Sequence, residues 1–229
     1  TIDNSEREYC FDPKFTKEFE LEDGFYDWII CAYDRVGNKS KEKAIKFCID
    51  TKLPEPFSIE PDRASDIKNW RNTNNVTVTF GTTDETSGVE RYEFILDNGE
   101  WNICESPLDL GVLYDGIHHV FIRAIDKAGN ARLESLDIYV DVTNPNEFDI
   151  TANINEKEWT SVSSIILNFD TEDATSGIKR YTLSIDGTEE IEFYSGKATS
   201  IIPDGKHILT VYAYDWAENV TSTSAEYYL

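Results

Sequence analysis

Residues 115–130 read DGIHHVFIRAIDKAGN, and two other segments follow the same pattern: 23–38 reads DGFYDWIICAYDRVGN and 204–219 reads DGKHILTVYAYDWAEN. Asp, Gly, Ala, Asp and Asn stand at equal offsets in all three copies, which begin 92 and 89 residues apart. A period of about 90 residues is the length of one small β-domain. The chain is therefore a tandem repeat that carries this segment once in each unit.

The sequence outside this segment keeps the same register from copy to copy. Matching pairs include Asp50-Thr-Lys-Leu-Pro54 with Asp141-Val-Thr-Asn-Pro145, Trp70 with Trp159, and Ser87-Gly88-Val89 with Ser176-Gly177-Ile178. We therefore expect two whole repeats, at 53–143 and 144–229, preceded by the C-terminal half of an earlier repeat at 1–52. Because the first copy is entered in mid-repeat, we expect the chain to be a slice of a longer array.

Apolar residues within each copy alternate with a period of two rather than 3.6. Val76, Val78 and Phe80 alternate with Thr77 and Thr79, and Gly- and Asn-rich turns separate such runs. Strands with one steadily apolar face pack as two sheets, face to face. The sequence thus predicts an all-β fold of tandem β-sandwiches, with about seven short strands in each.

The amino-acid composition argues against two classes of function, nucleic-acid binding and membrane insertion. The 229 residues include 21 Lys+Arg and 44 Asp+Glu, for a formal net charge of −23, and 40% are hydrophobic. This apolar content is enough for packed cores, whereas the acidity argues against a nucleic-acid partner, which needs a positive face. No apolar run reaches the about 18 residues of a membrane span, so no membrane insertion is expected in this segment.

The repeat pattern resembles bacterial and archaeal Ig-like (fibronectin-III-like) repeats of large cell-surface proteins. In the second copy the pattern comprises Asp84, Ser87-Gly88-Val89, Tyr92, Leu96-Asp97, Trp101, Asp115–Asn130 and Asp141–Pro145. The resemblance covers both full copies and the half copy, and it implies tandem Ig-like sandwiches in an extracellular or cell-surface protein. The third copy departs from it at Glu218, where the turn has Gly in the others, so that Glu218 has a positive φ or the turn type differs.

The repeated acidic residues have two interpretations. Asp34, Asp126 and Asp215 precede a four-residue turn, and an Asp in this place commonly accepts backbone N–H bonds as a turn cap. Alternatively, linker carboxylates meet loop carboxylates of the following repeat and bind calcium. The two candidate groups are Asp50, Asp84 and Asp126 at the first junction, and Asp141, Asp173 and Asp215 at the second.

Calcium fits the residue types, because a hard cation needs converging carboxylate and carbonyl oxygens. The resemblance adds that Ig-like repeats of giant adhesins place calcium at such junctions. No single loop has the compact D-x-D-x-D-G spacing of a calcium loop, so both interpretations stay open.

Two kinds of covalent modification are also predicted. Asn38, Asn75 and Asn219 begin N-x-[ST] sequons and are glycosylation candidates in a secreted protein. Cys31 and Cys48 lie on the two arms around the Gly37-Asn38 turn, which makes them candidates for a cross-strand disulfide. Free thiols are the equally weighted alternative.

The sequence contains no G-x-S-x-G, HExxH, P-loop or GxGxxG motif, and its placed carboxylates recur in every copy rather than marking one. We therefore expect no enzyme. The predicted function is structural: a stalk, adhesin or surface-layer (S-layer) segment that spaces or assembles other domains, with neighbouring repeats and like chains as partners. The alternative is a non-catalytic, glycan-binding accessory region of a secreted carbohydrate-active enzyme. Short linkers containing Pro54 and Pro145 predict a semi-rigid rod.

Overall fold

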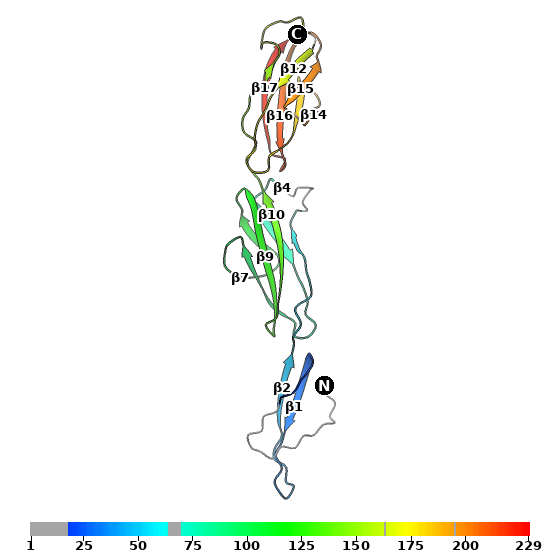
Figure 1. Ribbon diagram of the computed structural model, residues 1–229, viewed down its shortest axis with the longest axis vertical. Coiled ribbons are helices and arrows are strands. Elements are labelled where there is room, and N and C mark those ends of the chain that lie inside the picture. The colour runs from blue at the N-terminus through cyan, green and yellow to red at the C-terminus, as the bar shows by residue number, and fades with distance from the viewer. Residues whose placement is uncertain (1–17, 64–69, 163, 195) are drawn as a thin grey trace.

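A computed structural model describes residues 18–63, 70–162, 164–194 and 196–229. Three units follow one another along the long axis of the molecule (Figure 1). The first 17 residues of the predicted half repeat, 1–52, lie outside the described residues. Strands alone form the regular structure of the described part, as the period-two alternation predicts. No helix in that part is long and apolar enough to cross a membrane.

The middle unit is a sandwich of two sheets. The strands of its smaller sheet, in spatial order, are β3 (Ile59–Pro61), β5 (Asn75–Phe80) and β8 (Leu108–Val112). The strands of its larger sheet are β4 (Trp70–Arg71), β10 (Ala131–Val140), β9 (Gly116–Asp126), β6 (Val89–Leu96) and β7 (Asn102–Cys104). All pairs are antiparallel except β4 with β10, which is parallel.

The last unit repeats this arrangement. One sheet consists of β11 (Thr151–Ala152), β12 (Ser164–Asn168) and β15 (Lys197–Ile201). The other consists of β14 (Ile191–Phe193), β13 (Ile178–Ile185), β16 (Lys206–Asp215) and β17 (Val220–Tyr228). A parallel bridge between Trp159 and Tyr228 takes the place of the β4–β10 pair, whose first partners are Trp70 and Tyr139.

Each sandwich has its own core between its two sheets. Val76, Val78, Val120 and Ile122 are fully buried in the middle unit, and their counterparts in the last unit include Ile165, Leu167, Leu209 and Val211. Burial of these alternate residues confirms the predicted period of two and the predicted all-β sandwich fold.

The first unit contributes a hairpin of β1 (Gly24–Ile30) and β2 (Lys43–Ile49), which form a two-stranded sheet in the described part of the chain. Its register pairs Phe25 with Cys48 and Ile30 with Lys43. Cys31 therefore lies just beyond the Lys43 end of the hairpin, about 20 Å along the strands from Cys48 at roughly 3.3 Å per residue. The predicted Cys31–Cys48 disulfide is wrong, because register rather than separation around the turn decides which residues face each other.

Candidate cation site at the module junctions

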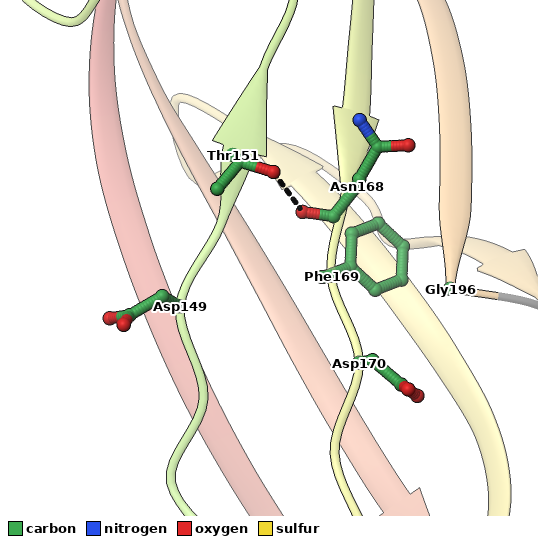
Figure 2. A pocket seen from close by; sticks show the side chains of 6 residues that line it. All are labelled: Asp149, Thr151, Asn168, Phe169, Asp170 and Gly196. Atoms are coloured by element: carbon green, nitrogen blue, oxygen red, sulfur yellow. Dashed lines mark hydrogen bonds between the residues drawn. The ribbon is translucent and has the colours of Figure 1, made fainter.

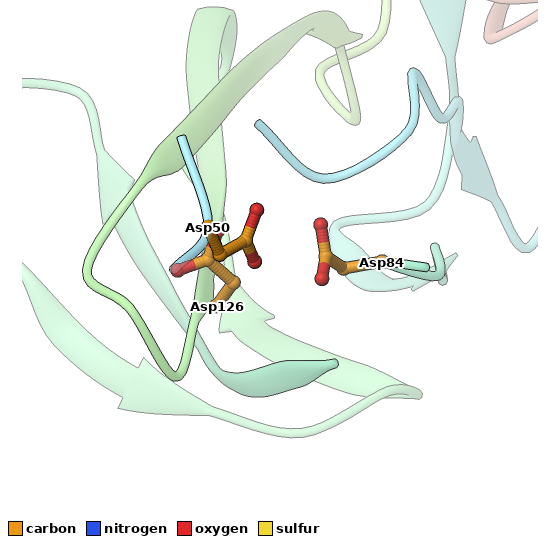
Figure 3. Close-up of side chains that lie close together, drawn as sticks. All are labelled: Asp50, Asp84 and Asp126. Carbon is orange, nitrogen blue, oxygen red and sulfur yellow. The ribbon is translucent and has the colours of Figure 1, made fainter. Parts of the chain in front are cut away.

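The structure brings together both predicted carboxylate groups. At the first junction, Asp50 follows β2, Asp84 lies in the β5–β6 loop and Asp126 ends β9. One carboxylate oxygen from each lies within 4.8 Å of the others, and the three side chains converge from separate segments (Figure 3). Asp141, Asp173 and Asp215 form the same group at the second junction. The long-range placement follows from the sandwich, whose loops β5–β6 and β9–β10 share one end.

The Asp at the end of each signature strand caps the following turn. Asp126 Oδ1 accepts the N–H groups of Ala128 at 2.8 Å and Asn130 at 2.9 Å, and Oδ2 accepts Asn130 Nδ2 at 2.8 Å. Asp34 makes the corresponding bonds in the first unit, and Asp215 accepts both the N–H and Nδ2 of Asn219. The turn-cap prediction is confirmed, and it leaves room for further ligation because carboxylate oxygens have several lone pairs.

The Asp of the β5–β6 loop uses a single oxygen for its backbone contacts. Asp84 Oδ1 accepts the N–H groups of Thr86, Ser87 and Gly88 at 2.8–3.2 Å. Asp173 repeats these bonds in the last unit at 2.8–3.1 Å. The turn needs Gly88, whose φ is +77°. In Figure 3 the Asp84 carboxylate faces the other two side chains across the junction.

The linker Asp fastens each unit to the next. Asp50 Oδ2 accepts the Ser87 N–H at 3.1 Å, and Asp141 Oδ2 accepts the Ser176 N–H at 3.0 Å. The linker carbonyls also bond to the turn: Asn130 Nδ2 donates to the Asp50 carbonyl at 3.1 Å. Sequence reasoning missed this role of the Asn, although its recurrence at the end of all three signature segments was a visible signal.

Asn219 plays the same role at the second junction; it stays a predicted glycan acceptor, one whose side-chain nitrogen is already bonded within the protein. Its Nδ2 donates to the Asp141 and Thr143 carbonyls and to Asp215 Oδ2, at 2.7–3.1 Å. A glycan on that nitrogen would replace a hydrogen that these bonds use. Asn38 Nδ2 is bonded to Asp34 at 2.6 Å, whereas Asn75 is exposed and stays a glycosylation candidate.

Burial makes the second group of carboxylates electrostatically costly. Burial raises the pKa of Asp215 to about 6, and repulsion from Asp141 and Asp173 adds to the rise. Burial also raises the pKa of Asp141, with a further contribution from Asp173. At the first junction the hydrogen bond from Ser87 instead holds the pKa of Asp50 below its ordinary value.

The donor set of each junction fits a hard cation such as calcium. Three carboxylates converge, and among the described residues no Lys or Arg forms an ion pair with any of the six. Ser176 Oγ is buried near Asp141 without completing a hydrogen bond, which leaves one more oxygen unsatisfied at the second junction. Oxygen ligands of this kind are what calcium takes in proteins.

A shallow hollow of about 530 Å³ lies elsewhere, on the β11–β12–β15 sheet of the last unit. Asp149, Thr151, Asn168, Phe169, Asp170 and Gly196 line it (Figure 2). Figure 2 shows the two carboxylates directed away from each other, so they do not form a pair facing a common substrate position.

Comparison with known proteins gives structural likenesses only. No family model and no curated protein match this sequence. The chain is similar to the fibronectin(III)-like modules of Clostridium thermocellum CbhA, at 14% identity over 75% of this chain and 94% of that one, with a TM-score of 0.47. It is also similar to a 1.5-MDa bacterial ice-binding adhesin, at 16% identity over 90% and 74% of the two chains, with a TM-score of 0.38.

A third solved structure, a tetra-tandem repeat from the extending region of a large adhesion protein, is 20% identical over 91% of this chain and 57% of that one, with a TM-score of 0.31. The sheets and cores themselves define the class: this protein is a tandem array of Ig-like, fibronectin-III-like β-sandwich modules.

Proposed function

We propose that this chain is a structural spacer of an extracellular surface protein, a stalk or adhesin segment whose junctions are stiffened by calcium. The observation that carries this is the built linker. At both junctions the linker Asp is hydrogen-bonded into the following module, and an Asn from that module binds the linker carbonyl. A linker fastened on both its side chain and its backbone transmits orientation, which a flexible tether does not.

Calcium would act on the same residues. Asp141, Asp173 and Asp215 would supply carboxylate oxygens at the second junction, and Asp50, Asp84 and Asp126 at the first. A bound cation would offset the burial of the Asp215 carboxylate, which is the main cause of its raised pKa, and the smaller repulsion from Asp141 and Asp173. Since each group joins a linker to two loops of one module, binding would fix the angle between neighbouring units. Catalysis has no part in this proposal.

Thermal unfolding in EDTA, in about 5 mM CaCl2 and in equal MgCl2 tests the calcium component. Extracellular calcium modules bind with a Kd of about 10⁻⁴–10⁻³ M, so calcium should stabilise each site by about 1–2 kcal/mol. This corresponds to a rise in Tm of about 5 °C or more. Magnesium, which prefers its own waters, should have little effect.

Variants locate the ion. Asp141→Ala and Asp215→Ala should each abolish the calcium-dependent rise of the last module, while Asp149→Ala, an exposed Asp outside both groups, should keep it. Equal midpoints in EDTA and calcium would refute the calcium component. The spacer role has a separate test, because small-angle scattering in CaCl2 should give the length of a rod. A collapsed or freely jointed chain in both CaCl2 and EDTA would refute it.

A further inference from the structure

His118 is held on both ring nitrogens at the start of β9. Nδ1 lies 2.8 Å from Asp97 Oδ2, and Nε2 lies 2.8 Å from the Tyr114 carbonyl oxygen. Both partners are acceptors, so both nitrogens must donate, which only the protonated imidazolium does. The ring is well enclosed, with 13% of its side chain exposed.

The last module repeats this arrangement with different neighbours. His207 Nδ1 lies 2.7 Å from Asp186 Oδ2, and Nε2 lies 2.9 Å from the Pro203 carbonyl, again four residues upstream. Asp97 and Asp186 both have a φ of +52°, and the second oxygen of each accepts the N–H of the residue after its His at 2.8 Å. Two sites with the same geometry indicate a built feature rather than a chance contact.

The His118 contact leads directly to the second junction. Tyr114, whose carbonyl it holds, precedes Asp115. Asp115 Oδ1 accepts the Val142 N–H at 2.8 Å, and Oδ2 accepts the Thr143 hydroxyl. Val142 and Thr143 are the linker residues that follow Asp141, so the ring supports the loop that holds the linker.

The first junction has the same support with a different donor. Tyr26 stands at the His position, and its hydroxyl donates to the Glu22 carbonyl at 2.6 Å, four residues upstream. Asp23 then accepts the N–H and hydroxyl of Thr51 in the linker at 2.9 and 3.0 Å. A tyrosine hydroxyl donates this hydrogen bond as a neutral group, whereas the His118 ring needs a positive charge to donate from both nitrogens.

We propose that His118 is a pH-sensitive latch on the second linker, whereas Tyr26 is its pH-insensitive counterpart on the first. The imidazolium holds the loop before β9, and through Asp115 it holds the linker. Loss of the proton breaks one of the two hydrogen bonds of the ring, which loosens the loop before β9 and, through it, the linker. The latch deepens the proposed spacer role by making the stiffness of one junction depend on pH, and it needs no cation.

The groups around the ring set the direction of this effect. Asp97 comes from the turn after β6, Asp115 from the loop before β9, and Asp137 from β10 pairs with the adjacent His119 at 2.7 Å. Burial alone would lower the pKa of His118, but the bonds to the Tyr114 carbonyl and to Asp97 raise it above the ordinary value. A raised folded-state pKa means that the latch is fully closed below the unfolded-state pKa and opens as pH rises through the folded-state one.

Amide hydrogen exchange in EDTA tests the latch. Between pH of about 5.5 and about 8.5, the protection factor of Val142, corrected for intrinsic exchange, should fall about three- to tenfold, the effect of losing one hydrogen bond. Thr51 should keep its protection. His118→Tyr should make Val142 insensitive to pH, while the matched control His207→Tyr, in the other module, should leave the response of Val142 unchanged.

Each alternative result is decisive. A Val142 response that survives in His118→Tyr would assign it to the nearby carboxylates Asp141 and Asp215 and overturn the latch. Protection of Val120 in β9 reports whether the variant is folded. NMR titration of the unaltered chain gives an independent answer, because a His118 pKa at or below that of free histidine would also overturn the proposal. Since EDTA is present throughout, failure of calcium binding leaves this test intact.

Discussion

The two module junctions share one sequence pattern and one backbone arrangement, yet their carboxylates differ in energy. The pKa of Asp50 is lowered, whereas the pKa of Asp141 is raised. Asp50 retains 9% exposure and Asp141 none. Asp141 follows β10 and donates its N–H to the carbonyl of Arg71, the last residue of the parallel strand β4. The described part of the first unit has no counterpart of β4. Whether an Asp of this motif is stabilised therefore depends on the unit that precedes it.

The largest expected difference between the junctions comes from deleting the turn cap in EDTA. Asp126 accepts three hydrogen bonds, so Asp126→Ala should lower the free energy of unfolding of its module by about 4 kcal/mol. Asp215 accepts two and is repelled by Asp141 and Asp173, so Asp215→Ala should cost only about 2 kcal/mol.

Exchange of the fully buried amides of Val120 and Leu209 under global-unfolding conditions reads the two modules separately. Equal decreases in the free energy of unfolding of the two modules would show that repulsion among the carboxylates of the second junction does not destabilise the last module.

Acidification should change the stability contributed by the two junctions in opposite directions. Asp215 binds its proton more tightly in the folded state, so its carboxylate destabilises the last module as pH rises through about 6. Lowering the pH from about 7.5 to about 5 in EDTA should therefore stabilise that module by about 1.4 kcal/mol. Asp50 behaves oppositely: its lowered pKa contributes stability at neutral pH that is lost only in acid, below its ordinary value of 3.8.

The measurement is urea unfolding against pH in a His118→Tyr background, which removes the contribution of the latch. Asp215→Asn should abolish most of the response of the last module, because the amide keeps an acceptor oxygen and carries no charge. A response that is unchanged in Asp215→Asn would contradict the assignment.

The smallest expected difference in stability between the modules comes from the turn that follows the capping Asp, where Glu218 stands in place of Gly129. Glu218 has a φ of +68° where Gly129 has +96°, so the first of the two alternatives left open by the sequence holds. Arg180 and Lys179 pair with Glu218 and lower its pKa to about 2, offsetting the strain. Glu218→Gly should change stability by less than about 0.5 kcal/mol, since the strain relieved and the exposed ion pairs lost are each worth up to about 1 kcal/mol.

The reciprocal substitution in the middle module tests whether the ion pairs are what make Glu tolerable at this turn. Gly129→Glu should destabilise the middle module by about 1 kcal/mol, because Arg91 is already engaged by Glu90 and Glu93. Chemical denaturation of both variants is sufficient, and a neutral Gly129→Glu would show that the turn tolerates any residue.

Much of the candidate site was predictable because a tandem repeat compares the chain with itself. The recurrence of Asp84 with Asp173 and of Asp126 with Asp215 picked out loop carboxylates, and the sandwich topology implied that these loops share an end. The prediction that failed rested on residues found in one repeat only, so no comparison between copies could test it. Cys31 and Cys48 have no cysteine counterparts in the other copies, and separation around the turn was used in place of the strand register that keeps them apart.

The sequence by itself determined the repeat, the period-two strands, the sandwich class and the identity of the acidic groups, because alternation and recurrence are local or self-comparing signals. Only the tertiary structure decided which Asp is fully buried, that Asn219 is occupied by the linker carbonyls, and that His118 and Tyr26 support equivalent linkers. These properties depend on what packs against each side chain from another part of the chain. Burial, and with it the protonation of a carboxylate or an imidazole, is set by that packing rather than by the residue's own segment.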